Sequence, residues 1–203
     1  CFGNVPIVTD FTQKELPANS PRKDVFAFIE KELKDILPIL PSGTTYAKFT
    51  QNVANTLLAR LYLNAEVYTG TPRWQDCLDA CSKVQGYSLT PNYKASFAIQ
   101  NEKSPEIIFS IPYDHKQGTV GNYLASMTYH YNQKLAFDPA GVYQWCGNGI
   151  CAQPGLYSSF DEKDVRRQCL LIGQQYSAKD GSEVLMDDGS PLNYTEEIDN
   201  FTD

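Results

Sequence analysis

The sequence predicts a mainly α protein built on helix pairs, with a loop-rich, aromatic-rich portion and a few short strands. Two observations carry this prediction. An apolar stripe with helical spacing restarts after a short turn, and later this spacing fades while tyrosines accumulate among glycines, asparagines and glutamines. With 203 residues, of which 42% are hydrophobic and 20% charged, the chain is long enough to bury a core.

Residues 51–84 predict two helices joined by a tight turn. Thr50 is a natural N-cap for the first helix, and Gly70 can adopt the left-handed conformation that ends it. Thr71 and Pro72 then suit the cap and the first position of the second helix. Helices joined in this way must lie antiparallel and bury their stripes together, as the hairpins of helical-repeat proteins do. The stripes consist of Val53, Ala54, Leu57, Leu58, Leu61, Tyr62 and Ala65, and of Trp74, Cys77, Leu78, Cys81 and Val84.

The other elements follow from local patterns. Residues 1–9 read as an extended apolar segment, and Ser20 with Pro21 suits the start of a further helix. Residues 93–97 read as a short helix. Residues 106–111 form a β-branched run between prolines, which predicts a buried strand.

By character, we divide the chain into three parts of one domain, 1–203. Residues 20–85 form the helical scaffold, and residues 86–176 form a loop-rich portion suited to ligand binding. Within that portion, 160–167 resembles a helix start with acidic residues in its first turn. Residues 177–203 are polar and predict a hairpin or loop.

Charge and hydropathy exclude some classes of partner. The net charge of −7 and the pI near 4.8 give a field that repels phosphate backbones, so nucleic acid is not expected as a partner. No apolar run approaches the roughly 18 residues of a membrane span. Cys1 is followed by apolar residues rather than by a polar tether, so we interpret it as an internal cysteine and not as a lipid-anchored one.

The six cysteines do not predict a disulfide framework. Cys77 and Cys81 lie one helical turn apart on an apolar face, which is typical of buried free thiols. Cys146 and Cys151 flank a Gly-Asn-Gly loop, and a disulfide between them remains a hypothesis. No CxxC occurs, and the two histidines stand apart from the cysteines, so a zinc site has no support.

Several stretches are more specific in combination than any of them alone. These are FGNVPIVTDF, DVFAFIEKELKDILPILP, LLARLYLNAEVYTGTPRW with SPEIIF at a distance, and FDEKDVRR. With them the chain resembles the central part of SusD-like (RagB/SusD) proteins, the glycan-binding outer-membrane lipoproteins of Bacteroidetes. The resemblance covers residues 1–175, and the tail from residue 177 carries none of it.

The resemblance implies a tetratricopeptide-like scaffold that carries a sugar-binding, loop-rich portion. It implies non-catalytic capture of oligosaccharide or polysaccharide at the cell surface and delivery to a TonB-dependent outer-membrane transporter. It also implies a longer parent protein, in which a lipid anchor absent from this chain provides the membrane association.

Sugar recognition requires flat apolar surfaces for the C–H face of a pyranose and planar amides or carboxylates for its hydroxyls. The stretch 129–145 offers both. For any single ring, a role in the core remains the alternative, and Trp74 in the helix pair is interpreted as a packing residue. The hypothesis places a stacking platform at Trp145 and Tyr143, with Tyr131, Asn132 and Asn148 nearby.

Other functions have weaker support. A glycosidase needs two carboxylates facing each other across a sugar, but the acids at 161–164 suit a helix start and those at 187–188 suit a turn. No motif for a serine nucleophile, a phosphate loop or an EF-hand is present, so we expect neither catalysis nor a cofactor, although calcium remains possible. The alternative function is a helical-repeat scaffold that binds another protein, most naturally the transporter, without a sugar site of its own.

Overall fold

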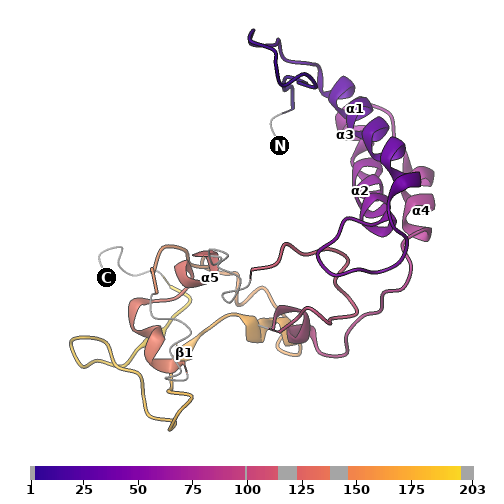
Figure 1. Cartoon of the computed structure of the whole chain (residues 1–203). Helices are drawn as coiled ribbons and strands as arrows, with labels where there is room; N and C mark the ends of the chain where they lie inside the picture. The colour runs from indigo at the N-terminus through magenta and orange to yellow at the C-terminus, as the bar shows by residue number, and fades with distance from the viewer. Residues whose placement is uncertain (1–2, 99, 114–122, 138–145, 198–203) are drawn as a thin grey trace. The chain divides into compact units, whose positions relative to one another are not determined.

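The computed structural model describes residues 3–98, 100–113, 123–137 and 146–197 (Figure 1). The chain forms two compact units, Cys1–Pro112 and Tyr113–Asp203. The first unit carries the long helices, and the second consists of short helices and small antiparallel pairings. The predicted fold class is therefore confirmed: the chain is mainly helical, with a loop-rich portion and few, short strands.

In the first unit, α2 packs against α4, and α1 packs against α2 and α3. Figure 1 shows these helices gathered into one bundle. The elements are α1 (Arg22–Ile36), the 3₁₀ helix η1 (Leu37–Ile39), α2 (Gln51–Leu63), α3 (Ala65–Thr69), α4 (Trp74–Ser82) and the 3₁₀ helix η2 (Tyr93–Phe97). Their buried core consists of Phe26, Leu33, Ala54, Leu58, Ala59, Tyr62, Ala65 and Ala80.

The predicted helix pair is present, with two local differences. Gly70 ends α3 with φ of 79°, and its N–H donates to the Glu66 carbonyl at 2.8 Å, as a left-handed C-cap does. However, the first helix is interrupted at Asn64, where φ is −102° and ψ is 8°. The second helix begins at Trp74 and not at Pro72, and the Thr71 N–H is instead bound by Thr69 Oγ1 at 3.1 Å.

The other two expected N-caps, Thr50 and Ser20, also differ from the prediction. Thr50 precedes α2 as expected, but its hydroxyl is buried and accepts no capping bond in the described part of the chain. Ser20 does not cap α1; it forms an antiparallel bridge with Val5 in the N-terminal segment. That segment supplies the cap, because Asn4 Oδ1 accepts the N–H of Arg22 at 2.9 Å.

The stripe on α4 is only partly covered. Cys77 is half-buried and Ala80 is buried beneath α2, whereas Trp74 is 50% exposed and Leu78 is 63% exposed. Cys81 is exposed as well, so the expectation of a buried thiol there is wrong. Trp74, interpreted as a packing residue, thus has half of its surface covered and half exposed.

Residues 106–111 do not form the predicted strand. No backbone hydrogen bond to another described segment involves residues 107–111. Ile107 and Ile108 are half-buried, and the ring of Phe109 meets that of Phe49 edge-on at 6.1 Å. The apolar run is thus held by side-chain packing. Its β-branched composition suits a packed extended segment as well as a hydrogen-bonded strand, so composition does not distinguish the two.

In the second unit, described residues of the tail, for which a hairpin or loop was predicted, take part in small antiparallel pairings. Strand β1 (Gly173–Gln174) pairs antiparallel with β2 (Asn193–Tyr194), and bridges Tyr176↔Glu183 and Leu185↔Pro191 lie between them. The helical elements are α5 (Tyr123–Met127) and the 3₁₀ helices η4 (Tyr131–Ala136) and η5 (Val165–Cys169). A small core of Ala136, Val184 and Leu192 joins η4 to the hairpins.

Two further expectations for this unit are corrected. The helix near 160–167 begins only at Val165, where Asp164 caps it by accepting the N–H of Arg166 at 2.9 Å. Cys146 and Cys151 are both free thiols, so the disulfide hypothesis is wrong. One thiol is buried and the other is exposed, and burial raises the pKa of Cys146.

Candidate functional site

The Gly-Asn-Gly loop of the second unit lies against the end of α5. The N–H of Gly147 donates to the Ser126 carbonyl at 2.9 Å, that of Asn148 to Tyr129 at 2.8 Å, and that of Gly149 to Met127 at 2.8 Å. These bonds bring the loop beside the segment that leads into η4. Asn148 and Tyr131, both predicted site residues, therefore belong to one small region.

Both of these residues reach solvent. The Tyr131 side chain is 54% exposed, and its ring meets that of His130 edge-on with centroids 5.6 Å apart. Asn148 is exposed and has φ of 44°, a left-handed conformation that asparagine tolerates better than most residues. An added Cβ at Gly149 would lie 2.0 Å from Cε at the flexible end of the Met127 side chain, so the loop packs directly against that side chain. An aromatic face and a planar amide are thus both exposed in this region.

Asn132 takes a different position from the one expected of a ligand-binding residue. It is buried, and its Nδ2 donates to the Leu185 carbonyl at 3.0 Å and to Asp187 Oδ1 at 3.2 Å. The neighbouring Gln133 accepts a 2.8 Å hydrogen bond from the Tyr194 hydroxyl, and burial raises the pKa of Tyr194 to about 12. Both amides therefore join η4 to the tail hairpins. Trp145 and Tyr143 lie outside the described residues.

The acidic groups singled out from the sequence take part in turns. Asp161 Oδ1 accepts the N–H of Lys163 at 2.8 Å, and Asp188 Oδ1 accepts that of Ser190 at 2.8 Å. Hydrogen bonds from Arg166 lower the pKa of Asp164 to about 2. These contacts are the ordinary structural use of aspartate beside a turn or a helix start.

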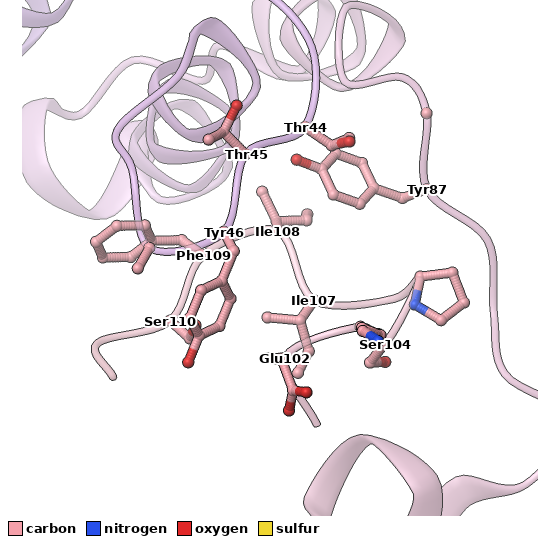
Figure 2. Close-up of a pocket in the computed structure, with 14 residues that line it drawn as sticks. Thr44, Thr45, Tyr46, Tyr87, Glu102, Ser104, Ile107, Ile108, Phe109 and Ser110 are labelled. Carbon is pink, nitrogen blue, oxygen red and sulfur yellow. The ribbon is translucent and has the colours of Figure 1, made fainter. Parts of the chain in front are cut away.

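A second concave region, which the sequence did not predict, lies in the first unit (Figure 2). We call it the loop pocket, and its volume is about 370 Å³. Its walls are residues 44–47 before α2, residues 86–87 after α4, and part of 102–110. Figure 2 shows Thr44, Tyr46, Tyr87 and Ile107 around the hollow.

The described residues contain neither a candidate metal site nor a candidate membrane-spanning helix. Residues 3–98, 100–113, 123–137 and 146–197 contain no group of three or more His, Cys, Asp or Glu side chains suited to holding a metal ion. Within the same ranges, no helix combines the length and the apolar character needed to cross a bilayer.

Comparisons with known proteins agree with the features described above. No family model matches the chain. Over 122 residues the chain is 34% identical to the starch-binding protein SusD of Bacteroides thetaiotaomicron, a match that covers 56% of this chain and 22% of SusD. The chain is therefore similar to SusD over this stretch.

Two solved structures share the fold of this chain. A surface glycan-binding protein A from Bacteroides uniformis matches with a TM-score of 0.60 at 20% identity, over 90% of this chain and 39% of its own. A SusD superfamily protein from Bacteroides fragilis matches with a TM-score of 0.62 at 16% identity, over 93% of this chain and 46% of its own. At such identities the likeness concerns the fold, and the chain spans less than half the length of these relatives.

The residues of the loop pocket had no recognisable signal in the sequence. Its threonines and tyrosines come from segments that are far apart in the chain and that are individually ordinary. The stretch 129–145 could be recognised from the sequence because its aromatic residues lie close together in the chain. A pocket assembled by folding offers no such local density.

Proposed function

We propose that the chain binds oligosaccharide or polysaccharide at the bacterial cell surface without cleaving it. The observation that carries this proposal is the 34% identity with a starch-binding protein over 122 residues. The exposed Tyr131 beside the exposed Asn148 supplies the chemistry that such binding requires, namely a stacking face and a planar amide.

Within this proposal, Tyr131 stacks on a sugar ring and Asn148 forms hydrogen bonds with its hydroxyls. On the basis of the sequence alone, the proposal also places Trp145 and Tyr143 in this stacking platform. Asn132 contributes by fixing η4, because its side chain is bonded to the tail. We further propose that a lipid anchor in the parent protein holds it on the outer membrane and that the captured glycan passes to a TonB-dependent transporter.

A second candidate function is protein binding by the helical scaffold. The exposed face of α4, with Trp74 and Leu78, favours it, since large apolar side chains on one helix face are common at interfaces. This candidate predicts a partner protein and no retention by polysaccharide.

Native gels cast with a panel of soluble polysaccharides separate the two candidates. We expect one polymer to retard the chain, and Tyr131→Ala and Trp145→Ala to reduce that retardation. Tyr176→Ala is the matched control, because Tyr176 lies in the same unit and is also 54% exposed. Retardation that survives both substitutions would refute the site, and no retardation by any polymer would favour the protein-binding candidate.

A further inference from the structure

We propose that the loop pocket of the first unit is a separate carbohydrate site, which binds one or two neutral sugar units. The proposal rests on the proposed function for the class of ligand alone. The site itself is argued from the walls of the pocket, the groups that line it and the backbone strain beside it.

The walls of the loop pocket are held by defined contacts. Asn52 is buried, and its Nδ2 donates to the Gly43 carbonyl at 3.1 Å and to the Gln85 carbonyl at 3.0 Å. The same side chain accepts the N–H of Gln85 at 3.2 Å. One amide thereby joins the loop before α2 to the segment after α4. At their meeting point Gly86 has φ of 89° and leaves room for Thr44, whose Cγ2 would lie 3.2 Å from an added Cβ.

Hydrogen bonds also join the wall formed by part of 102–110 to the segment that follows residues 86–87. The Ser88 N–H donates to the Pro105 carbonyl at 3.1 Å, and the carboxylate of Glu106 accepts both the N–H and the hydroxyl of Thr90, at 3.1 and 2.8 Å. These hydrogen bonds from Thr90 lower the pKa of Glu106, so the carboxylate stays ionised and remains bound to the wall. A pocket whose walls are fixed in advance loses little conformational entropy on binding.

The inner surface of the pocket combines hydroxyls with apolar carbon. The side-chain hydroxyls of Thr44, Thr45, Tyr46 and Tyr87 line it, and none of them has a hydrogen-bond partner among the described residues. Ile107 and Ile108 supply apolar surface. Free donors and acceptors beside aromatic and aliphatic carbon match a pyranose, which has hydroxyls at its edge and C–H groups on its faces.

The charge and size of the pocket narrow the class of ligand. Glu102 and Lys103 are its adjacent charged lining residues, they have opposite signs and both are exposed, so neither an anionic nor a cationic ligand is favoured. A volume of about 370 Å³ lies at the small end of ligand pockets, which span about 300–1,000 Å³. A neutral mono- or disaccharide unit fits these limits better than a long chain segment.

Backbone strain supports the assignment. Within the described residues, only Ala47 and Asn148 have positive φ without being glycine, at 57° and 44°. Strained backbone of this kind persists where the surrounding structure enforces it, and it is enriched at binding sites. Ala47 lies in the wall of the loop pocket, and Asn148 lies in the proposed site of the second unit.

Saturation-transfer NMR with maltose, cellobiose and lactose tests the proposal on the 203-residue chain. We expect transfer to at least one disaccharide. Removal of a single hydroxyl by Tyr46→Phe or Tyr87→Phe should weaken its affinity about two- to tenfold, and Tyr46→Ala should weaken it further. Tyr131→Ala should leave this binding unchanged while it reduces polysaccharide retention. Circular dichroism of each variant confirms that it is folded.

The outcomes separate this proposal from the proposed function. Disaccharide binding that is lost in Tyr131→Ala and unaffected by the pocket variants would overturn the loop-pocket site and support the site of the second unit. Absence of transfer to all three disaccharides would also overturn it, whatever the polysaccharide gels show. If no polysaccharide retards the chain but disaccharides bind and the pocket variants weaken that binding, the loop-pocket site is supported and the site of the second unit is not.

Discussion

The hydroxyl of Tyr62 donates a 2.8 Å hydrogen bond to Oε1 of Glu30, and this bond joins α2 to α1. Two cations share the same carboxylate oxygen, Lys34 at 2.5 Å and Arg73 at 3.3 Å. The Arg73 guanidinium also lies 4.8 Å from the centre of the Tyr62 ring. Glu30 therefore links α1 to α2 and to the residue that precedes α4.

Substitutions in this network should lower the stability of the first unit by different amounts. Tyr62→Phe removes one hydrogen bond and should cost about 1 kcal/mol. Glu30→Ala should cost about 2 kcal/mol, because it leaves the Tyr62 hydroxyl without its acceptor and leaves Arg73 with Asp76 alone. Urea unfolding measures both. Asp35→Ala, which breaks an exposed ion pair with Lys31 on the same helix, is the control and should change stability by less than about 0.5 kcal/mol.

The same network predicts how stability depends on pH. Burial raises the pKa of Glu30, but hydrogen bonds from Lys34, Tyr62 and Arg73 outweigh it and hold the pKa below the ordinary value of 4.5. A carboxyl whose pKa is lowered by folding stabilises the protein above its unfolded pKa, and this contribution disappears as the pH falls through the folded pKa. The difference in urea midpoint between the unsubstituted chain and Glu30→Gln should thus shrink below about pH 4.5. Two parallel curves from pH 7 to pH 3 would contradict this assignment.

Asn132 and Asn148 should respond in opposite ways to substitution. Asn132→Ala removes two hydrogen bonds from a buried amide and should destabilise the second unit by about 1–3 kcal/mol. Asn148→Gly keeps the positive φ accessible, so stability should hardly change, whereas glycan retention should fall. Thermal unfolding followed by circular dichroism and the native gels give the two readings. Equal destabilisation by both variants would show that Asn148 has a structural role as well.

Ala47→Gly should raise stability even though it shortens a side chain. The left-handed backbone of Ala47 costs an L-residue roughly 1–2 kcal/mol, and glycine removes this cost. Glycine also has more conformational freedom in the unfolded chain, which lowers the free energy of unfolding by about 0.4–1 kcal/mol. The expected net gain is about 0.5 kcal/mol in urea unfolding. Ala80→Gly is the matched control in α4, where the same change should cost at least about 1 kcal/mol. A loss of stability at position 47 would show that the methyl group packs in the pocket wall.

Periodicity predicted the parts of the fold that depend on near neighbours in the sequence. Val53, Ala54, Leu58, Tyr62 and Ala65 are all buried as their spacing requires, and Gly70 ends the helix as expected. These features follow from contacts one or two helical turns apart. The outer side of α4 was not predicted, since an apolar stripe does not say how much of it a neighbouring helix covers.

Long-range partners explain the other differences. Asn4 caps α1 in place of Ser20, because the N-terminal segment lies beside the start of that helix. Asn132 donates to the Leu185 carbonyl, which is 53 residues away in the sequence. An asparagine among tyrosines has the same local sequence pattern whether its side chain binds a sugar or donates a hydrogen bond to a distant backbone carbonyl. The sequence could therefore indicate a candidate region that includes Tyr131 and Asn148, whereas the contacts of each side chain depend on tertiary structure.

The chain has two tryptophans, and the boundary between the compact units separates them in sequence. Trp74 belongs to the first unit, where half of its surface meets solvent, and Trp145 belongs to the residue range of the second. Trp145→Phe thus leaves a fluorophore that reports on the first unit alone, and Trp74→Phe leaves one for the second. Coincident fluorescence transitions in the two variants would mean that the units unfold as one cooperative system, and separate midpoints would give each unit its own stability.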